Sequence, residues 1–393
     1  MIDSAERVVP ETLDALSEAM RGCHARGEAL TFVGGGTDLG LGYPPERVDR
    51  VISTQQLARV VDYAPDDMTV TVEAGVTLAA LQAAVAQRGQ RLALDPPRPE
   101  RTTIGGLLAT NGYGPRRARY GTLRDLVLGA SLVRADGERV RGGGKVVKNV
   151  AGFDVPKLLV GSLGSLGCIA SATFRLHPLP EMERTVVMRC ASAASVRALC
   201  VALTEAQLEP SAVVAFGVDG EFDVAILFEG FASGVDQQAT ACATRARALG
   251  IAPSDGAGDA TWRARHDAAR TRGDVRVKAT FRTAAFAEVD RGALAPLQRT
   301  LRDAALVVYP TAGVAFCCGD AADAEAVLAA LAAARTCAEL AGGTLVAIDA
   351  PGDVRQRFDV YGTTPGALPL MREIKARFDP DRRCNAGRFV GHL

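Results

Sequence analysis

Glycines are the residues of this chain whose type and spacing say most about chemistry. One glycine-rich turn reads G-G-G-T-D-L-G-L-G from Gly34 to Gly42. A later stretch opens with T-I-G-G-L-L-A-T-N-G-Y-G at Thr103 and closes with V-G-S-L-G-S-L-G-C-I at Ile169. Glycine lets a backbone approach a ligand closely and turns successive N–H groups toward one anion. Turns this far apart in the sequence predict one long, phosphate-bearing cofactor held between two lobes.

The spacing of these glycines argues against two common phosphate-binding motifs. The Rossmann fingerprint G-x-G-x-x-G fails at Gly34, because Leu39 stands where the third glycine is required. No G-x-x-x-x-G-K-[ST] occurs, and Lys145 of the G-G-G-K run is followed by valine. Taken alone, the first turn has a structural alternative, a tight loop that needs a positive φ.

The elements that must position these turns alternate between helix and strand. A helix is predicted at 10–29, and a strand at 30–33 runs straight into the first turn. Further strands are expected at 47–53, 60–63, 69–73 and 91–94, with a helix capped by Thr77 that continues to Arg88. The sequence H-P-L-P, ending at Pro180, closes this α/β or α+β lobe.

A different pattern follows Pro180. Helices are predicted at 193–205, 237–249 and 321–341, and strands at 212–218, 223–228, 275–279, 312–318 and 344–348. Strand–helix–strand repeats with few glycines are typical of an antiparallel sheet covered by helices. A last helix is expected at 368–378.

Composition limits the function classes. The chain has 393 residues, enough for two domains, and its 45 Lys plus Arg equal its 45 Asp plus Glu, so no overall basic charge recruits nucleic acid. The sequence has no apolar run near 18 residues and no signal-like N-terminal segment, so we expect a cytoplasmic protein. Its nine cysteines form no C-x-x-C pair, and we predict buried thiols and no metal site.

Three motifs together resemble the p-cresol methylhydroxylase-type FAD-binding domain, a fold shared with vanillyl-alcohol oxidase. They are G-G-G-T-D-L-G from Gly34, P-P-R-P-E-R-T-T-I-G-G from Pro96, and K-N-V-A-G-F-D-V-P-K-L-L-V-G-S-L-G-S-L-G-C-I from Lys148. Within that family, G-P-R-R, R-Y-G-T-L-R-D-L-V-L-G and G-G-K-V-V-K-N-V-A-G-F-D look like the FAD-binding E-type subunit of bacterial glycolate oxidase. The resemblance covers nearly all of 1–180 and, more loosely, N-A-G-R-F at 385–389.

The resemblance implies an α+β fold in three parts. A two-lobe FAD-binding domain would span 1–180, and a smaller helix-covered antiparallel-sheet domain at 181–365 would bind substrate or a partner. A tail at 366–393 would return to the FAD domain.

The resemblance also implies a set of cofactor-binding residues. The pyrophosphate of FAD would lie on Gly34, Gly35, Gly36, Thr37 and Asp38. Further contacts would come from Pro96, Thr103, Ile104, Gly105, Gly106, Ala109, Thr110, Asn111, Tyr120, Gly121, Gly164, Gly167 and Ile169. Some members of the superfamily bind FAD covalently through a histidine in the first turn. Because Thr37 takes that position here, we expect noncovalent FAD.

Charged residues around the second glycine-rich segment allow more than one interpretation. Either they are solvated, or they neutralise FAD phosphates or dock a partner; they are Arg98, Arg101, Arg116, Arg117, Arg119, Lys145, Lys148 and Lys157. In the tail, Arg388 is expected near the flavin edge or at an interface.

The resemblance implies oxidation of a 2-hydroxy acid, glycolate or D-lactate, through flavin. The resembling subunit works with a second FAD-containing subunit and an iron–sulfur subunit, and partners of this kind could bring the chain to a membrane. Related stand-alone dehydrogenases use a histidine-rich motif, whereas this chain has only four scattered histidines. The catalytic residues therefore stay unassigned. Two alternatives stay open: a subunit that holds FAD for assembly or electron relay without its own turnover, and a free-standing oxidase of another alcohol.

Overall fold

The computed structural model describes residues 2, 4–145, 152–254 and 259–393. The chain forms two compact units, each described here by itself. The first unit contains Met1–Gly114, Gly121–Leu179 and Thr363–Leu393, and the second contains Pro115–Tyr120 and Pro180–Gly362. The predicted α+β class is confirmed, since helices accompany sheets that are mostly antiparallel.

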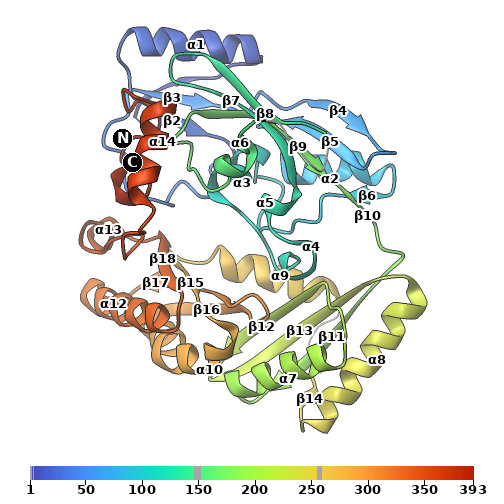
Figure 1. Ribbon diagram of the computed structural model, residues 1–393. Coiled ribbons are helices and arrows are strands. Elements are labelled where there is room, and N and C mark those ends of the chain that lie inside the picture. The colour runs from blue at the N-terminus through green and yellow to red at the C-terminus, as the bar shows by residue number, and fades with distance from the viewer. Residues whose placement is uncertain (1, 3, 146–151, 255–258) are drawn as a thin grey trace. The chain divides into compact units, whose positions relative to one another are not determined.

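A small parallel sheet begins the first unit (Figure 1). Its order is β1-β3-β2, formed by Glu6–Val8, Arg50–Ser53 and Leu30–Val33. Helix α1 (Leu13–Ala25) buries Leu16 and Met20 in the core beside this sheet. It is shorter than the predicted 10–29, because the Thr12 side chain caps its first turn by accepting from the Ala15 N–H.

A five-stranded antiparallel sheet forms the rest of the first unit's framework. Its order is β4-β5-β9-β7-β8, with the bounds Val60–Ala64, Thr69–Glu73, Cys168–Arg175, Val127–Val133 and Arg139–Gly143. The helices around it are α2 (Leu78–Ala86), α3 (Ile104–Thr110), α5 (Leu123–Leu126), α6 (Val155–Leu159) and α14 (Leu368–Phe378). Of the strand predicted at 91–94, only Arg91 is in a strand, the short β6 (Gln90–Arg91), which pairs with β10 (His177–Pro178).

The second unit is built on one eight-stranded sheet of order β14-β11-β13-β12-β16-β17-β15-β18. All its pairings are antiparallel. The strands are β11 (Met182–Cys190), β12 (Ala212–Val218), β13 (Glu221–Gly230), β14 (Ala252–Pro253), β15 (Val275–Thr280), β16 (Leu301–Tyr309), β17 (Val314–Ala321) and β18 (Thr344–Asp349). The helices are α4 (Arg117–Tyr120), α7 (Ala193–Glu205), α8 (Ala232–Ala248), α9 (Asp259–Arg270), α10 (Phe286–Val289), α11 (Ala295–Thr300), α12 (Ala324–Leu340) and α13 (Gly352–Arg357).

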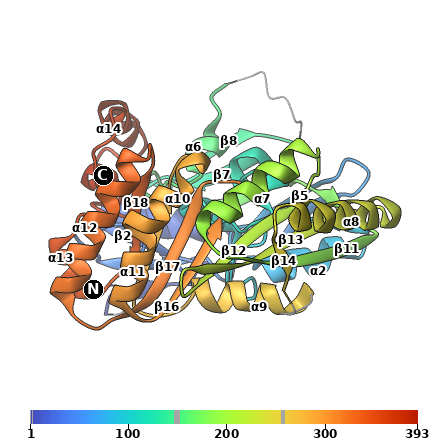
Figure 2. The ribbon, with the colours of Figure 1, turned by 90° about the horizontal axis from the view of Figure 1, so that it is seen from below.

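More helices pack on one face of this sheet than on the other. One core joins alternate strand residues such as Val224 and Ile226 to the buried sides of α7, α8, α11 and α12. Figure 1 shows α9 on the opposite face of the sheet from α7 and α10, and in Figure 2 α7, α10 and α11 cross in front of the strands. In the described part of the chain, no helix is both long and apolar enough to cross a membrane.

Candidate cofactor site

Glycines from three segments meet in the first unit around a cavity of about 60 Å³. Of the predicted cofactor residues, those that line it are Gly34, Gly105, Gly106, Ala109, Gly164, Gly167 and Ile169. The others that line it, absent from the prediction, are Phe32, Val33, Thr54, Leu163, Cys168 and Asn385. The structure therefore brings seven of the predicted residues together at one place.

Thr103 joins the first turn to the second glycine-rich segment. Its hydroxyl oxygen accepts from the N–H of Gly106 at 3.3 Å and from the N–H of Gly35 at 3.4 Å. The first of these bonds caps α3, so residues 104–110 form a helix and not the turn expected from their glycines. The sequence did not predict this helix, because glycine has a low helix propensity. The close packing of this segment nevertheless requires glycine at these positions.

Close backbone packing explains the glycines at these positions. A Cβ atom on Gly34 would lie 2.2 Å from Thr103 Oγ1, and one on Gly35 would lie 1.6 Å from the carbonyl oxygen of Arg101. A Cβ atom on Gly105 would lie 2.8 Å from the Cβ of Ala74. These contacts leave no space for a side chain, so glycine is required at these three positions.

The third segment is bonded to the end of α3. The N–H groups of Gly161 and Leu163 donate to the carbonyl oxygens of Leu108 (2.7 Å) and Ala109 (2.8 Å). Leu163 and Gly164 have positive φ angles of 51° and 70°. The leucine adopts a conformation that L-residues rarely take, and these bonds hold it there.

Two residues of the tail contact this site and the first turn. The N–H of Asn385 donates to Leu30 O at 2.8 Å, and its side-chain amide donates to Leu163 O at 2.6 Å. Arg388 donates to Leu39 O and Leu41 O at 2.6 and 2.8 Å. Arg388 therefore braces the first turn through its carbonyl oxygens, a contact that the sequence did not predict.

Other predicted residues lie outside the lining of the cavity. In the first turn, the carbonyl oxygen of Thr37 accepts from Arg98 at 2.6 Å. Tyr120 belongs to the second unit, where its hydroxyl lies 3.4 Å from Glu229 Oε2. The remaining predicted residues that do not line it are Gly35, Gly36, Asp38, Pro96, Thr103, Ile104, Thr110, Asn111 and Gly121. Their contacts with FAD stay predictions, and Lys148 lies outside the described residues.

The arginines do not form one cluster. Arg98 lies at the first turn, whereas Arg116 pairs with Glu229 (2.6 Å) and Glu183 (3.0 Å) in the second unit. The two glutamates stand directly opposite each other on neighbouring strands. Burial, more than any other cause, raises the pKa of Glu183. Arg116 therefore compensates the buried Glu229 and the half-buried Glu183, an arrangement that depends on strand pairing and that the sequence did not reveal.

The residues around the cavity suit one part of a dinucleotide such as FAD, since a volume of about 60 Å³ holds only a few of its atoms. The buried side-chain atoms of the described residues that have no hydrogen-bond partner include Ser53 Oγ, Asn111 Oδ1 and Asn385 Oδ1. Asn385 lines the cavity, and Ser53 pairs in register with Val33, which also lines it. Buried polar atoms without partners are costly unless a ligand or water satisfies them. Burial raises the pKa of Cys168 to about 12, so its thiol stays neutral beside the cavity.

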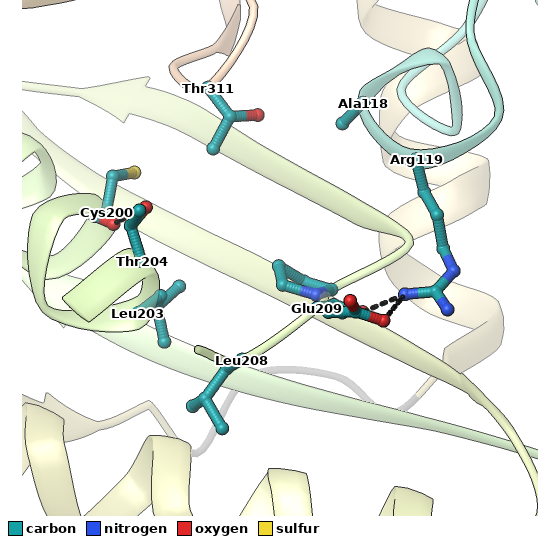
Figure 3. A pocket seen from close by; sticks show the side chains of 9 residues that line it. Ala118, Arg119, Cys200, Leu203, Thr204, Leu208, Glu209 and Thr311 are labelled. Carbon is teal, nitrogen blue, oxygen red and sulfur yellow. Dashed lines mark hydrogen bonds and ion pairs between the residues drawn. The ribbon is translucent and has the colours of Figure 1, made fainter. Parts of the chain in front are cut away.

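A larger pocket lies in the second unit. Its volume is about 490 Å³, and Figure 3 shows Cys200 and Thr204 on one side and Arg119 on the other. Arg119 is bonded there to Glu209 at 2.8 Å, and burial raises the pKa of the Cys200 thiol to about 12. Neither residue is therefore an available charge or nucleophile in this pocket. The smaller cavity in the first unit has the stronger case as a cofactor site.

Comparison with known families agrees with this geometry. Residues 5–143 match the family of FAD binding domains. The chain therefore contains an FAD-binding domain of the p-cresol methylhydroxylase type, and FAD is the cofactor of this domain. The matched residues include the first two glycine-rich segments, and the third lies beyond them.

Curated relatives match part of this chain and part of their own length. The chain is 33% identical over 180 residues to glycolate oxidase subunit GlcD of Bacillus subtilis, covering 46% of this chain and 38% of that protein. It is 39% identical over 123 residues to subunit GlcE of Escherichia coli, covering 31% and 35%. It is 36% identical over 173 residues to a D-lactate dehydrogenase of Archaeoglobus fulgidus, covering 44% and 38%. Each match thus spans less than half of the relative's length.

Solved structures extend the likeness to the whole fold. Alkyldihydroxyacetonephosphate synthase superposes with a TM-score of 0.74 over 96% of this chain and 76% of that one, at 17% sequence identity. At this identity the likeness concerns the fold alone.

Proposed function

We propose that this chain is the FAD-binding component of an oxidoreductase that oxidises a small 2-hydroxy acid, with glycolate or D-lactate as the candidate substrates. The observation that carries the proposal is the convergence of the three glycine-rich segments on one cavity beside buried, unpartnered polar atoms. The relatives named glycolate oxidase subunits and D-lactate dehydrogenase support the substrate class. FAD would supply the chemistry of a hydride acceptor, and the protein would supply binding and orientation.

In this proposal FAD is bound without a covalent link. Backbone N–H groups of the first turn and of the segment at 161–169 would bind its phosphates and ribose, and Thr103 would hold two of the glycine-rich segments together. Thr37 offers no ring nitrogen for attachment. Denaturation of the purified protein should therefore release all of its flavin into the supernatant. Flavin that stays with the precipitate would overturn noncovalent binding.

The second candidate is a subunit that holds FAD for assembly or electron relay without its own substrate turnover. It is favoured by the lining of the cavity, in which Cys168 is the one residue with a titratable side chain. The two candidates are separated by anaerobic titration of the purified holoprotein. Bleaching of the flavin absorbance by glycolate or D-lactate supports oxidation by this chain alone, whereas reduction only after partner proteins are added supports relay.

We further propose that the chain works in a complex with a second FAD-containing subunit and an iron–sulfur subunit, since relatives of this chain include two different glycolate oxidase subunits. Affinity purification from the native host tests this. Co-purification of a second flavoprotein and a cysteine-rich protein is expected, and a homogeneous single chain would contradict the proposal.

A further inference from the structure

Residues of the segment from Gly161 to Gly167 line two separate concave sites, and only one of these is the cofactor cavity. Leu163, Gly164 and Gly167 line the cavity of about 60 Å³. The neighbouring Ser162, Ser165 and Leu166 line a separate groove of about 350 Å³ in the same unit. One short stretch of chain therefore separates the cofactor cavity from a second concave site.

The walls of this groove are mainly apolar. Leu158 of α6, Met371 and Ile374 of α14, and Phe389 near the end of the tail contribute half-buried side chains to it. Its volume lies at the lower end of the range for small-molecule sites, roughly 300–1,000 Å³. The groove therefore suits a small ligand with an apolar body.

Two polar features give the groove a preferred ligand charge. Arg124 donates to the neutral carbonyl oxygen of Lys157 at 3.3 Å, and no carboxylate of the described residues lies within ion-pair distance of its guanidinium. The lysines are different: Lys157 pairs with Asp154 at 2.9 Å and Lys375 with Asp379 at 2.6 Å. Arg124, Lys157 and Lys375 line the groove together with the Asp154 carboxylate, so the side chains of the lining carry a net positive charge, which favours an anionic ligand.

Ser162 adds an unused hydrogen-bonding group. It is 5% exposed, and within the described chain its hydroxyl has no hydrogen-bond partner. By contrast, the hydroxyl of Ser165 in the same segment donates to Ser162 O at 2.8 Å. A buried hydroxyl without a partner costs stability, and a ligand oxygen in the groove would remove that cost.

We propose that this groove binds a medium-chain carboxylate, with its chain on the apolar wall and its carboxylate at Arg124, and that such binding tightens the binding of FAD. The physical link is the 161–167 segment. Leu163 and Gly164 must keep positive φ angles to line the cofactor cavity, and a ligand against Ser162 would restrict the same stretch of backbone. If one ligand has already restricted this backbone, the second ligand binds with a smaller loss of conformational entropy. Linkage requires the effect to be reciprocal.

The test uses the full chain with its flavin removed, and octanoate as the probe. Calorimetry should show sub-millimolar binding of octanoate and much weaker binding of octanol, which lacks the charge. The dissociation constant of FAD, measured by flavin fluorescence, should fall about fivefold at saturating octanoate, the lower end of typical couplings. None of these measurements needs substrate turnover, so they stand or fall separately from the proposed oxidation.

Matched variants assign the binding to the groove. Arg124→Gln should weaken octanoate about tenfold, the usual loss for a charge-assisted hydrogen bond. Arg372→Gln, an exposed position of α14 outside the lining, should leave octanoate affinity unchanged and controls for net charge. Equal octanoate affinity in the two variants would overturn the proposal, as would the absence of binding to the parent protein. Displacement of octanoate by FAD would also overturn it, because the groove would then belong to the cofactor.

Discussion

Replacing Thr103 with valine isolates the contact that joins two of the glycine-rich segments. Valine keeps the shape of the side chain and removes only the oxygen that accepts from Gly35 and Gly106. Loss of a helix N-cap costs about 1 kcal/mol. Loss of the bond to the first turn adds about 1 kcal/mol, because the Gly35 N–H is left without its acceptor. We expect the free energy of unfolding to fall by about 2 kcal/mol in total.

The chain offers a close control for this substitution. Thr77 caps α2 by accepting from the Ala80 N–H at 3.2 Å, and its backbone bridges that of Thr103. Thr77→Val should therefore cost about 1 kcal/mol, the value of its cap alone. It should leave the affinity for FAD unchanged, since among the described residues its hydroxyl makes no hydrogen bond to a glycine-rich segment.

FAD affinity is the decisive measurement. If the contact between Thr103 and Gly35 shapes the cofactor site, losing about 1 kcal/mol there raises the dissociation constant of FAD roughly fivefold. Urea titrations of the flavin-free proteins give the stabilities, and flavin fluorescence gives the affinities. Thr103→Ser, which keeps the oxygen, should restore most of both. Equal FAD affinity in Thr103→Val and Thr77→Val would refute the reasoning.

Three further predictions rest on separate contacts. Gly164→Ala should weaken FAD binding, because Gly164 has a φ of +70° and an added Cβ would lie 2.8 Å from a side-chain nitrogen. Gly250→Ala should lower stability alone, because Gly250 has a similar φ of +71° but open space around the added Cβ. Similar FAD affinities of the two variants would contradict this prediction. Arg116→Met should cost about 3–5 kcal/mol, because it leaves the buried Glu229 carboxylate without its ion-pair partner, while Glu183 keeps Arg263. The exposed Arg119→Met should cost at most about 1 kcal/mol, and urea unfolding measures both. Burial raises the pKa of Asp290 to about 6 from 3.8, so its ionisation removes stability as pH rises through that window. Asp290→Asn should gain about 1–3 kcal/mol at pH 7.5 and little at pH 4, and a gain independent of pH would disprove that origin.

Local sequence signals predicted part of the fold well. The strands at Leu30–Val33 and Thr69–Glu73 and the helices at Ala193–Glu205 and Leu368–Phe378 have the predicted bounds. In each of them, an apolar pattern or a neighbouring cap or turn residue marks the ends. These signals act over a few residues, so a single sequence contains them.

The remaining site features depend on contacts between distant residues. The bond from Asn385 to Leu163 spans 222 positions, and nothing local to either residue signals it. The helix at Ile104–Thr110 runs against the low helix propensity of its glycines, which packing against Ala74 requires. The role of Arg116 stayed open between solvent exposure, phosphate binding and partner docking, because its glutamate partners come from strands that follow much later in the chain.

The composition of the cavity has a consequence for catalysis. Glycine backbone and apolar side chains line it, and the one titratable side chain among its lining residues is the Cys168 thiol, which burial keeps protonated. Such walls can hold a phosphate-bearing cofactor, but they supply no base for the hydroxyl proton of a 2-hydroxy acid. A base must therefore come from residues outside this lining or from a partner protein. For this reason, anaerobic reduction of the isolated holoprotein by glycolate or D-lactate, and not flavin content, decides between an enzyme and an electron-relay subunit.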